Sequence, residues 1–441
     1  MNPFTHIGRL IRHSATGPVR LPAPLSWRML TRDPAAAVQR AILMEYLKTG
    51  STTSRLLDLG IALMFWPFRT FAQAMRLTRQ VGGQVTHIRS RPAQFFQQIW
   101  LALFHGISPY MSYQAGIISS AAPVRPMQWL QNGHAGLLSR IFKDDKSLPE
   151  INDKVLFAEI IAAAGVSTPS TLAVFEAGRL VSGLGEADFI REVAKHDGLF
   201  VKPVQSSGGK GAIMLLRQEN REWRLMASAL GSPAFQRITQ TLLHQEYGSP
   251  ALWNVLGTLS NTGRLVVQPR LRNHPGLPAL GGPALMAVRV LSGLGENGVV
   301  LLRAVLRLPF SSSVASQHGV DALVDLDTGR LGQVFIDSLD QRFHRAMPPT
   351  GPVIEGAILP FWRESLDMVK KAHSALPSYP FLGWDVAITP SGPVALEANG
   401  NYGLAGLQKP GPAPLIDEQF LSVFDYWSTK MDNLAFKTVS Q

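Results

Sequence analysis

The 441-residue chain contains no cysteine, which excludes disulfide bonds, zinc–thiolate centres, iron–sulfur clusters and thiol nucleophiles. Charged residues are also scarce, at 17% of the chain, whereas hydrophobic residues make up 46%. This balance excludes an intrinsically disordered chain, because disordered segments carry many charges and few apolar side chains. The length allows two or three domains of about 100 to 200 residues each.

Acidic residues are rare in the first third of the chain. Residues 1–150 hold 17 Lys and Arg but only 6 Asp and Glu, while the remaining 25 basic and 25 acidic residues balance each other. The whole net charge of +11 therefore comes from the N-terminal part. This asymmetry disfavours nucleic acid as a partner and favours a neutral catalytic unit behind a basic leader.

Long hydrophobic runs are missing as well. The strongest run, LGIALMFWPF, lies between Asp58 and Arg69 and has about half of the roughly 20 residues that span a bilayer. The first 30 residues scatter Arg and Pro through weakly apolar sequence, unlike a signal peptide. We therefore expect a cytoplasmic protein, either free or peripheral on the inner face of the membrane.

The segment Leu56–Arg79 is predicted to be a helix with two open interpretations. It is either a core helix whose aromatic side chains pack internally, or an interfacial helix whose arginines face anionic lipid. The aromatic residues are Phe65, Trp66, Phe68 and Phe71, and the arginines are Arg69, Arg76 and Arg79.

Near residue 150 the sequence changes to alternating helix and strand signals. Asp153–Ala164 has apolar residues at helical spacing and is followed by Gly165, which favours a helix end. The predicted strands are Thr171–Phe175, Leu199–Val204, Ile213–Leu216, Leu265–Gln268, Ala287–Leu291, Val299–Leu308, Ala322–Asp325, Gly383–Ile388 and Val394–Glu397. Strand hairpins outnumber strand–helix–strand units, so the fold class is α+β.

Lys202 ends an apolar strand and leads directly into a glycine-rich loop that contains Lys210. In such a loop, glycines let backbone N–H groups approach an anion, serine hydroxyls donate hydrogen bonds and lysines neutralise charge. The loop is not a Walker A motif, because it lacks the GK[ST] ending and leads into a strand. Alone, it fits a phosphate lid and a flexible hairpin tip equally well.

Two carboxylates and an amide lie on the last predicted hairpin. The turn at 389–392 folds the strands of Asp385 and Glu397 into an antiparallel pair, with Asn399 two residues further on. Carboxylate and amide oxygens are hard ligands that suit Mg²⁺. The alternative is that Asp385 and Asn399 only close turns.

These motifs, in this order, resemble those of the ATP-grasp family over about residues 150–415. NDKVLFAEIIAAAGVSTP is similar to the family's opening, LFVKPVQSSGGKGA to its phosphate-clamping strand and loop, and GWDVAITPSGPVALEANGN to its closing metal hairpin. The resemblance narrows to the sugar-transfer-associated branch because of three further stretches, LFHGISPYMSY, VVQPRLRNHPGL and GLQKPG. The resemblance implies two α+β lobes that clasp ATP at 150–415, after a basic, mainly helical region at 1–149 and before a C-terminal helix and tail at 416–441.

The resemblance also implies a role for each matching residue. Lys154 and Lys202 would bind the α and β phosphates, and Asp385, Glu397 and Asn399 would hold Mg²⁺. The loop that would close over the β and γ phosphates consists of Ser206, Ser207, Gly208, Gly209, Lys210 and Gly211.

Further roles fall at the hinge near 268–271 and on the central strands. Three hinge residues would contact adenine and ribose, namely Gln268, Arg270 and Leu271. The glutamine departs from the carboxylate that is usual there. Arg289, with Arg303 or Arg307 as a second candidate, would face the transferred phosphate or the substrate carboxylate, and Lys202, Arg289 and Arg307 form the predicted catalytic set. Surface-paired strand arginines are the alternative.

The implied activity is ATP-dependent ligation of a carboxylate to an amine through an acylphosphate, with ATP and Mg²⁺ as cofactors. The partners would be a small-molecule or glycan-linked carboxylate and an amine acceptor, in polysaccharide or cell-envelope assembly. Two alternatives stay open: a kinase that phosphorylates a hydroxyl, and a membrane-associated protein that senses nucleotide without catalysis.

Overall fold

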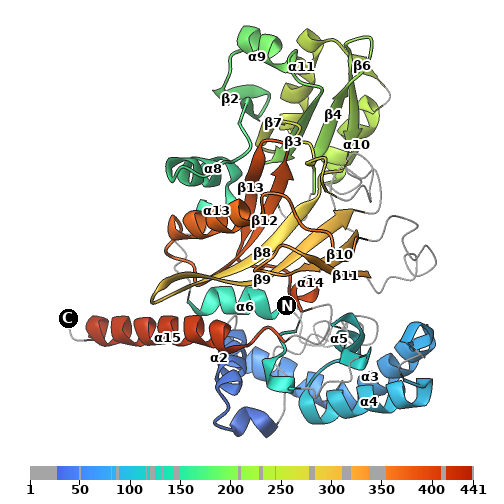
Figure 1. Ribbon diagram of the computed structural model, residues 1–441, viewed down its shortest axis with the longest axis vertical. Coiled ribbons are helices and arrows are strands. Elements are labelled where there is room, and N and C mark those ends of the chain that lie inside the picture. Colours follow the sequence, from blue (N-terminus) through green and yellow to red (C-terminus); the bar gives the residue numbers. More distant parts are fainter. Residues whose placement is uncertain are drawn as a thin grey trace.

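Two antiparallel sheets form the centre of the protein, and helices lie around them (Figure 1). The protein is seen in a computed structural model. It describes residues 27–48, 51–80, 82–85, 89–115, 117–119, 125–131, 133–142, 149–206, 210–227, 232–243, 245–277, 284–309, 319–336, 354–408 and 414–439.

The first sheet has seven strands in the order β2-β1-β7-β3-β4-β5-β6. Their bounds are β1 Ala173–Glu176, β2 Arg179–Gly183, β3 Gly198–Pro203, β4 Ile213–Arg217, β5 Trp223–Ala227, β6 Glu246–Tyr247 and β7 Leu265–Pro269. One face packs against α9 (Glu186–Val193), α10 (Pro233–Leu242) and α11 (Ser249–Ser260) and holds a core of its own that includes Phe189, Leu199 and Leu256.

The second sheet has six strands in the order β11-β10-β9-β8-β12-β13. Their bounds are β8 Ala287–Gly295, β9 Gly298–Pro309, β10 Gly319–Val324, β11 Leu331–Ile336, β12 Phe381–Thr389 and β13 Gly392–Asn399. The hairpin β12–β13 turns at Gly392, whose φ of 117° is a conformation that favours glycine. One face of this sheet packs against α8 (Lys154–Ala163) and α13 (Trp362–Ser374).

The opposite face of the six-stranded sheet shares its core with N-terminal and C-terminal helices. Leu291 and Val305 of the sheet lie in one cluster with Val38 of α2, Leu138 of α6 and Phe420 of α15. The helices not yet bounded are α2 Pro34–Lys48, α3 Thr52–Gln80, α4 Arg91–His105, α5 Pro109–Gln114, α6 His134–Ile141, α7 Pro149–Asn152, α14 Leu404–Leu407 and α15 Glu418–Val439. Part of the N-terminal region therefore packs on the two-sheet unit, while the division at residues 149 and 415 stays a prediction.

The α+β fold class and the predicted strands are confirmed within a few residues at their ends. The predicted helix is α8, which Asp153 caps by accepting from the N–H groups of Val155 and Leu156 at 2.9 and 3.1 Å. It ends before Gly165, whose φ is 68°. Strands β2, β5, β6 and β11 were not predicted. Three of these form sheet edges, and an exposed edge strand such as β2 shows no buried alternation.

The helix predicted at Leu56–Arg79 is present as α3, but its aromatic residues do not all pack internally. Trp66 is buried, whereas Phe68 is 74% exposed and Phe71 is 51% exposed. The interpretation of α3 as an ordinary core helix is therefore wrong for the side chains on its outer face.

A buried histidine ties α13 to the six-stranded sheet. His373 Nε2 lies 2.9 Å from the Tyr379 carbonyl oxygen, which can only accept, so Nδ1 must accept from the Ser292 hydroxyl at 2.7 Å. Trp384 in turn donates to Ser292 Oγ at 2.9 Å. Burial lowers the pKa of His373 to about 4, against the opposing effect of the hydrogen bond to the Tyr379 carbonyl, so the ring is neutral at pH 7.

Stability is expected to fall on acidification between about pH 6.5 and pH 4. In this window an unfolded His373 takes up a proton that the folded protein excludes, so unfolding is favoured by about 3 kcal/mol over the range. Denaturant titrations at several pH values should show this slope. His373→Gln should be less stable at neutral pH and lose that part of the slope, and an unchanged slope in the variant would contradict the assignment.

Candidate active site

Lys154 opens α8 and points under the segment that follows β3. Its side chain is 8% exposed, and Nζ donates to the Ser206 carbonyl at 2.8 Å and to the Val204 carbonyl at 3.4 Å. Burial lowers the pKa of Lys154, and the nearby carboxylates of Glu397 and Asp153 act in the opposite direction. The first predicted phosphate-binding lysine is therefore influenced electrostatically by Glu397 of β13.

Lys202 lies near the end of β3 and interacts with the same carboxylate. Burial lowers the pKa of Lys202 to about 8, with Glu397 and Asp385 opposing the shift and Lys154 adding to it. The register Lys202↔Val266 and Phe200↔Gln268 places Lys202 and Gln268 on one face of the seven-stranded sheet. Lys154 of α8 and Lys202 of the seven-stranded sheet are thus both influenced by Glu397 of the six-stranded sheet.

The loop after Lys202 is described at both ends. Ser206 is held by Lys154, Lys210 is exposed, and Gly211 has a φ of 74°. A Cβ at Gly211 would lie 2.9 Å from Pro203, so a side chain would not fit there without a shift. The predictions for Ser207, Gly208 and Gly209 lie outside the described residues.

The hairpin β12–β13 brings the predicted metal ligands together. Asp385 is directly opposite Glu397, and Gly383 is opposite Asn399, with a bulge after Asp385. The Asn399 amide donates to Glu397 Oε1 at 3.2 Å. The three predicted ligands therefore form one group, although their role as ligands stays a prediction.

Arg289 of β8 is an internal partner of this group. Its Nε donates to Asp385 Oδ1 at 2.5 Å, its Nη2 to Oδ2 at 2.8 Å, and its Nη1 to the Tyr402 carbonyl at 2.7 Å. Burial would raise the pKa of Asp385, but Arg289, with Arg307, holds that pKa below its usual range. Gly383 makes room for this arrangement, since a Cβ there would lie 2.3 Å from Tyr402 Cβ.

Arg307 of β9 has a different environment. It pairs in register with Ala287 on one side and with Asp321 on the other, which places it on the same sheet face as Arg289. A Cβ at Gly403 would lie 3.4 Å from Arg307 Nη2 and 3.7 Å from Arg289 Nη1, so both guanidinium groups approach this glycine. Within the described ranges, Arg307 makes no hydrogen bond or ion pair. The alternative candidate Arg303 donates to the Pro414 carbonyl at 3.2 Å instead.

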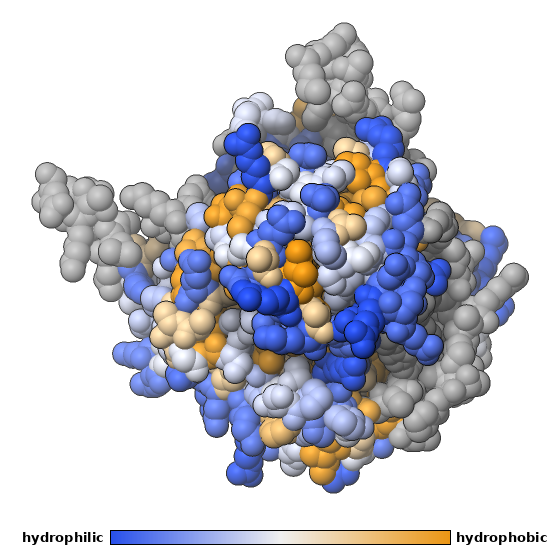
Figure 2. All heavy atoms as spheres, turned by 90° about the horizontal axis from the view of Figure 1, so that it is seen from above, coloured by the Kyte–Doolittle hydropathy of each residue, from blue (hydrophilic) through white to orange (hydrophobic). Residues whose placement is uncertain are grey.

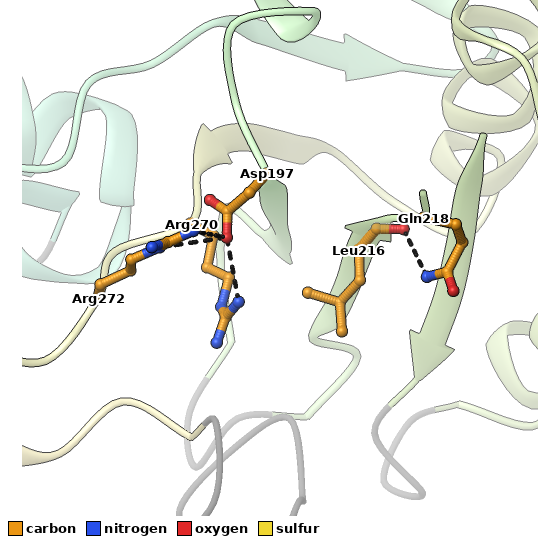
Figure 3. Close-up of polar contacts among 5 residues, drawn as sticks. All are labelled: Asp197, Leu216, Gln218, Arg270 and Arg272. Atoms are coloured by element: carbon orange, nitrogen blue, oxygen red, sulfur yellow. Dashed lines mark hydrogen bonds and ion pairs between the residues drawn. The ribbon is translucent and has the colours of Figure 1, made fainter. Parts of the chain in front are cut away.

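The residues predicted at the hinge have partners in and beside the seven-stranded sheet. Gln268 is buried and its amide donates to the Pro169 carbonyl at 3.5 Å. Arg270 and Arg272 both bind Asp197, as Figure 3 shows, and the N–H of Arg270 donates to the Gly198 carbonyl at 2.9 Å. The guanidinium of Arg270 is therefore paired with Asp197, while Leu271 is partly exposed.

Sequence reasoning missed Asp321, Gly383 and Tyr402. The Tyr402 side chain is 1% exposed, its hydroxyl has no hydrogen-bond partner in the described ranges, and burial raises its pKa. Asp321 is 3% exposed. The available signal was an aspartate at an inward position of a strand, where a charge requires a partner.

The residues present fit a Mg²⁺ ion that takes its other ligands from phosphates and water. No group of three His, Asp or Glu side chains forms a metal site in the described part of the chain. Asp385, Glu397 and Asn399 supply two carboxylates and one amide, and the lowered pKa of Asp385 keeps that carboxylate ionised. Mg²⁺ sites of nucleotide-dependent enzymes commonly use one or two carboxylates in this way.

The profile of the family described as sugar-transfer associated ATP-grasp matches residues 136–419, which is more than half of the chain. The chain belongs to this family. The resemblance found in the sequence is therefore confirmed. The match begins inside α6, so it includes a helix that packs on the six-stranded sheet.

Several solved ligases have low similarity to this chain. The VanG D-Ala:D-Ser ligase from Enterococcus faecalis is 14% identical over 65% of this chain and 63% of that chain, with a TM-score of 0.36. A D-alanine–D-alanine ligase from Bacillus anthracis is 12% identical over 70% of this chain and 77% of that chain, with a TM-score of 0.34. The sugar-transfer associated ATP-grasp chain thus spans less than two thirds of the VanG ligase. No protein of curated function matches the sequence.

Proposed function

We propose that the protein is an ATP-dependent ligase that joins a carboxylate to an amine in polysaccharide or cell-envelope assembly. The observation that carries the proposal is that the Glu397 carboxylate of β13 acts electrostatically on both Lys154 of α8 and Lys202 of β3. Such a set can bind a polyphosphate and its counter-cation between two sheets. Family membership supports ATP as the nucleotide, and the family's description supports a sugar-transfer setting.

In the proposed site, each lobe has a separate task. Lys154 and Lys202 neutralise and orient the phosphates, and the glycine-rich loop predicted from the sequence at 206–211 would cover them and exclude water. Mg²⁺, held by Asp385, Glu397 and Asn399, would supply further neutralisation of phosphate charge. Gln268, Arg270 and Leu271 border the nucleotide at the hinge, where the Arg270 guanidinium has a structural partner in Asp197.

The two arginines divide between positioning and substrate contact. Arg289 positions Asp385 and the Tyr402–Gly403 backbone through its three hydrogen bonds. Arg307, which has no such partner within the described ranges, is the group that would bind the carboxylate or the transferred phosphate. Arg289 therefore acts in catalysis through Asp385, and Arg307 acts on the substrate directly.

The proposed reaction has two steps. A carboxylate oxygen attacks the γ-phosphorus in line, the bond to the β–γ bridging oxygen breaks, and ADP leaves. The amine then attacks the carbonyl carbon of the acylphosphate, phosphate leaves, and the nitrogen loses a proton to give the amide. The chain's residues hold the reacting groups close together and stabilise the developing charge.

Transfer of ¹⁸O tests this reaction against the alternatives. With an ¹⁸O-labelled sugar acid and an amino sugar as probes, the ligase places one labelled oxygen in the released phosphate. A kinase would place phosphate on a hydroxyl without an amine requirement, and a nucleotide sensor would bind ATP without turnover. Unlabelled phosphate formed together with amide would contradict the acylphosphate.

Lys202→Ala is expected to weaken ATP binding about tenfold or more, because a charge-assisted phosphate contact contributes about 1.5 to 3 kcal/mol. In the unaltered protein, the affinity for ATP should be constant below the Lys202 pKa of about 8 and fall above it. Above that pH the Lys202 ammonium of the nucleotide-free protein loses its proton and with it the charge that attracts phosphate. Calorimetry from about pH 7 to pH 9.5 measures both effects. Lys370→Ala, at an exposed position of α13, is the matched control, and equal ATP affinity in Lys202→Ala would place the nucleotide elsewhere.

A further inference from the structure

Helices α3 and α4 form a hairpin that buries polar side chains beside apolar ones and leaves large apolar side chains exposed on its outer face. Gln94 and Gln98 of α4 are fully buried. The Gln98 amide donates to the Thr78 hydroxyl of α3 at 2.8 Å, and Gln94 Oε1 accepts from the Tyr113 hydroxyl at 2.7 Å. A helix that packs on a core and faces water normally has polar side chains on its outer face, so the exposed apolar side chains need an explanation.

The outer face of the hairpin holds most of the exposed apolar side chains of the described residues. Ten of fifteen exposed large hydrophobic side chains belong to these two helices, and Phe68 and Phe96 are 74% and 68% exposed. The ten are Leu56, Leu57, Leu63, Met64, Phe68, Phe71, Phe96, Trp100, Leu103 and Phe104. At the opposite end of the molecule, hydrophobic residues are scattered among hydrophilic ones (Figure 2). A concentration of this kind marks an interaction surface.

The ten side chains form one continuous face. On each helix the exposed apolar positions recur at spacings of three, four or seven residues, so they form a stripe along one side. The helices lie side by side, because the rings of Phe71 and Phe95 are 5.4 Å apart and Trp66 Nε1 donates to the Ala102 carbonyl at 3.1 Å. The two stripes therefore merge.

The charge around this face has one sign. Between residues 52 and 105, Asp58 is the only acidic residue, against six arginines. The arginines are Arg55, Arg69, Arg76, Arg79, Arg89 and Arg91. Arg76, Arg79 and Arg91 are exposed at the end of the hairpin where α3 ends and α4 begins. A partner must therefore offer an apolar layer bordered by negative charge.

We propose that the outer face of the α3–α4 hairpin binds an anionic lipid bilayer and lies flat in its interface. The aromatic and aliphatic side chains would enter the boundary between headgroups and acyl chains, while the arginines contact lipid phosphates. Flat binding agrees with the helices themselves, since none in the described ranges is long and apolar enough to cross a bilayer. A second copy of the chain is a poorer partner, because it would set arginines against arginines.

The hairpin is docked to the rest of the protein and would orient it on the membrane. The Gln131 amide donates to the Gly106 carbonyl at 2.7 Å, and Trp129 packs with Leu101 and Ile107. In Figure 1, α3 and α4 lie at the end of the molecule opposite the seven-stranded sheet. Membrane binding would therefore leave the seven-stranded sheet on the side away from the bilayer.

Cosedimentation of the full chain with phosphatidylcholine vesicles that contain about 30% phosphatidylglycerol tests the proposal. We expect the protein in the vesicle pellet at physiological salt and its release at about 1 M salt, where the Debye length falls from about 8 to 3 Å. Vesicles of phosphatidylcholine alone should retain much less protein. Equal binding to both vesicle types, or no binding to either, would overturn the proposal.

Two variants separate the apolar and the charged contributions. The triple variant Phe68→Gln, Phe96→Gln and Trp100→Gln should reduce partitioning at least about 100-fold. Replacing Arg76, Arg79 and Arg91 by Gln should reduce it by a similar factor and remove most of the salt dependence. Val181→Gln with Ile358→Gln is the matched control, because these exposed apolar residues lie outside the hairpin and should leave binding unchanged.

Trp100→Phe keeps the experiment informative if the triple variant does not fold. Brominated lipids should quench the fluorescence of Trp100 in the unaltered protein, and Trp100→Phe should bind vesicles normally with less quenching.

A protein partner or a dimer predicts a different result. If the protein self-associates without vesicles, and the triple variant abolishes that association, the face is a protein interface and the lipid proposal is wrong. The readouts are independent of ATP turnover, so they are distinguishable from a failure of the proposed ligase activity.

Discussion

Glu397→Gln is expected to lower ATP-dependent turnover at least about 100-fold while the protein remains folded. Glu397 interacts with both Lys154 and Lys202 and lies directly opposite Asp385, so it connects the phosphate-binding lysines to the predicted metal ligands. Removing one preorganised electrostatic group from such a site commonly lowers kcat by a factor of 100 to 1,000. The substitution preserves shape, because the amide has the volume of the carboxylate.

Three measurements define this result. Turnover is followed as ADP release, folding as the unfolding midpoint, and metal dependence as the ratio of ATP affinities with and without Mg²⁺. That ratio should be large in the unaltered protein and close to one in Glu397→Gln. Glu355→Gln, at an exposed position, is the control. Unchanged ATP consumption in Glu397→Gln would refute the metal assignment.

Arg289→Leu is expected to destabilise the protein by about 3 to 5 kcal/mol. The substitution leaves Asp385 without its two hydrogen bonds from Nε and Nη2, in surroundings where burial already disfavours the carboxylate. Breaking a buried ion pair by removing one partner is costly because the remaining charge is not compensated. Urea titration measures the loss.

A second substitution separates the ion pair from other effects of Arg289. The double variant Arg289→Leu/Asp385→Leu should recover much of the lost stability, since neither charge remains, yet it should be inactive. Arg307→Leu should change stability by only about 1 kcal/mol, because Arg307 has no ion-pair partner in the described ranges. If Arg307→Leu were as destabilising as Arg289→Leu, the division into positioning and substrate-binding arginines would be wrong.

The elements that sequence patterns predicted best are those with local signals. Asp153 and Gly165 bound α8 because their side-chain chemistry and backbone freedom act within a few residues. The turn at 389–392 implied the pairing of β12 with β13, and with it the proximity of Asp385, Glu397 and Asn399. The edge strands β2 and β11 gave no such signal, because an edge strand is partly exposed and its pairing partner is the main constraint.

The partners of the site arginines were not accessible from local signals. Arg289 and Asp385 are 96 residues apart in the chain, and only the β8–β12 register places them opposite each other. Arg289 and Arg307 look alike in the sequence, as inward positions on neighbouring strands. In the structure their environments differ. The Arg289 guanidinium donates to the Asp385 carboxylate and the Tyr402 carbonyl, whereas the Arg307 guanidinium faces Gly403.

The sequence by itself determined the fold class, the ATP-grasp family and the residues that meet in the candidate site. The reason is that motif order and motif spacing can be read directly from the amino-acid sequence. The tertiary structure alone decided which charges pair, that α2 and α6 share the core of the six-stranded sheet, and that α3 and α4 turn apolar side chains outward. The physical reason is that burial is a property of the assembled surface. A helix with one apolar stripe has the same sequence pattern whether that stripe faces a protein core or the solvent.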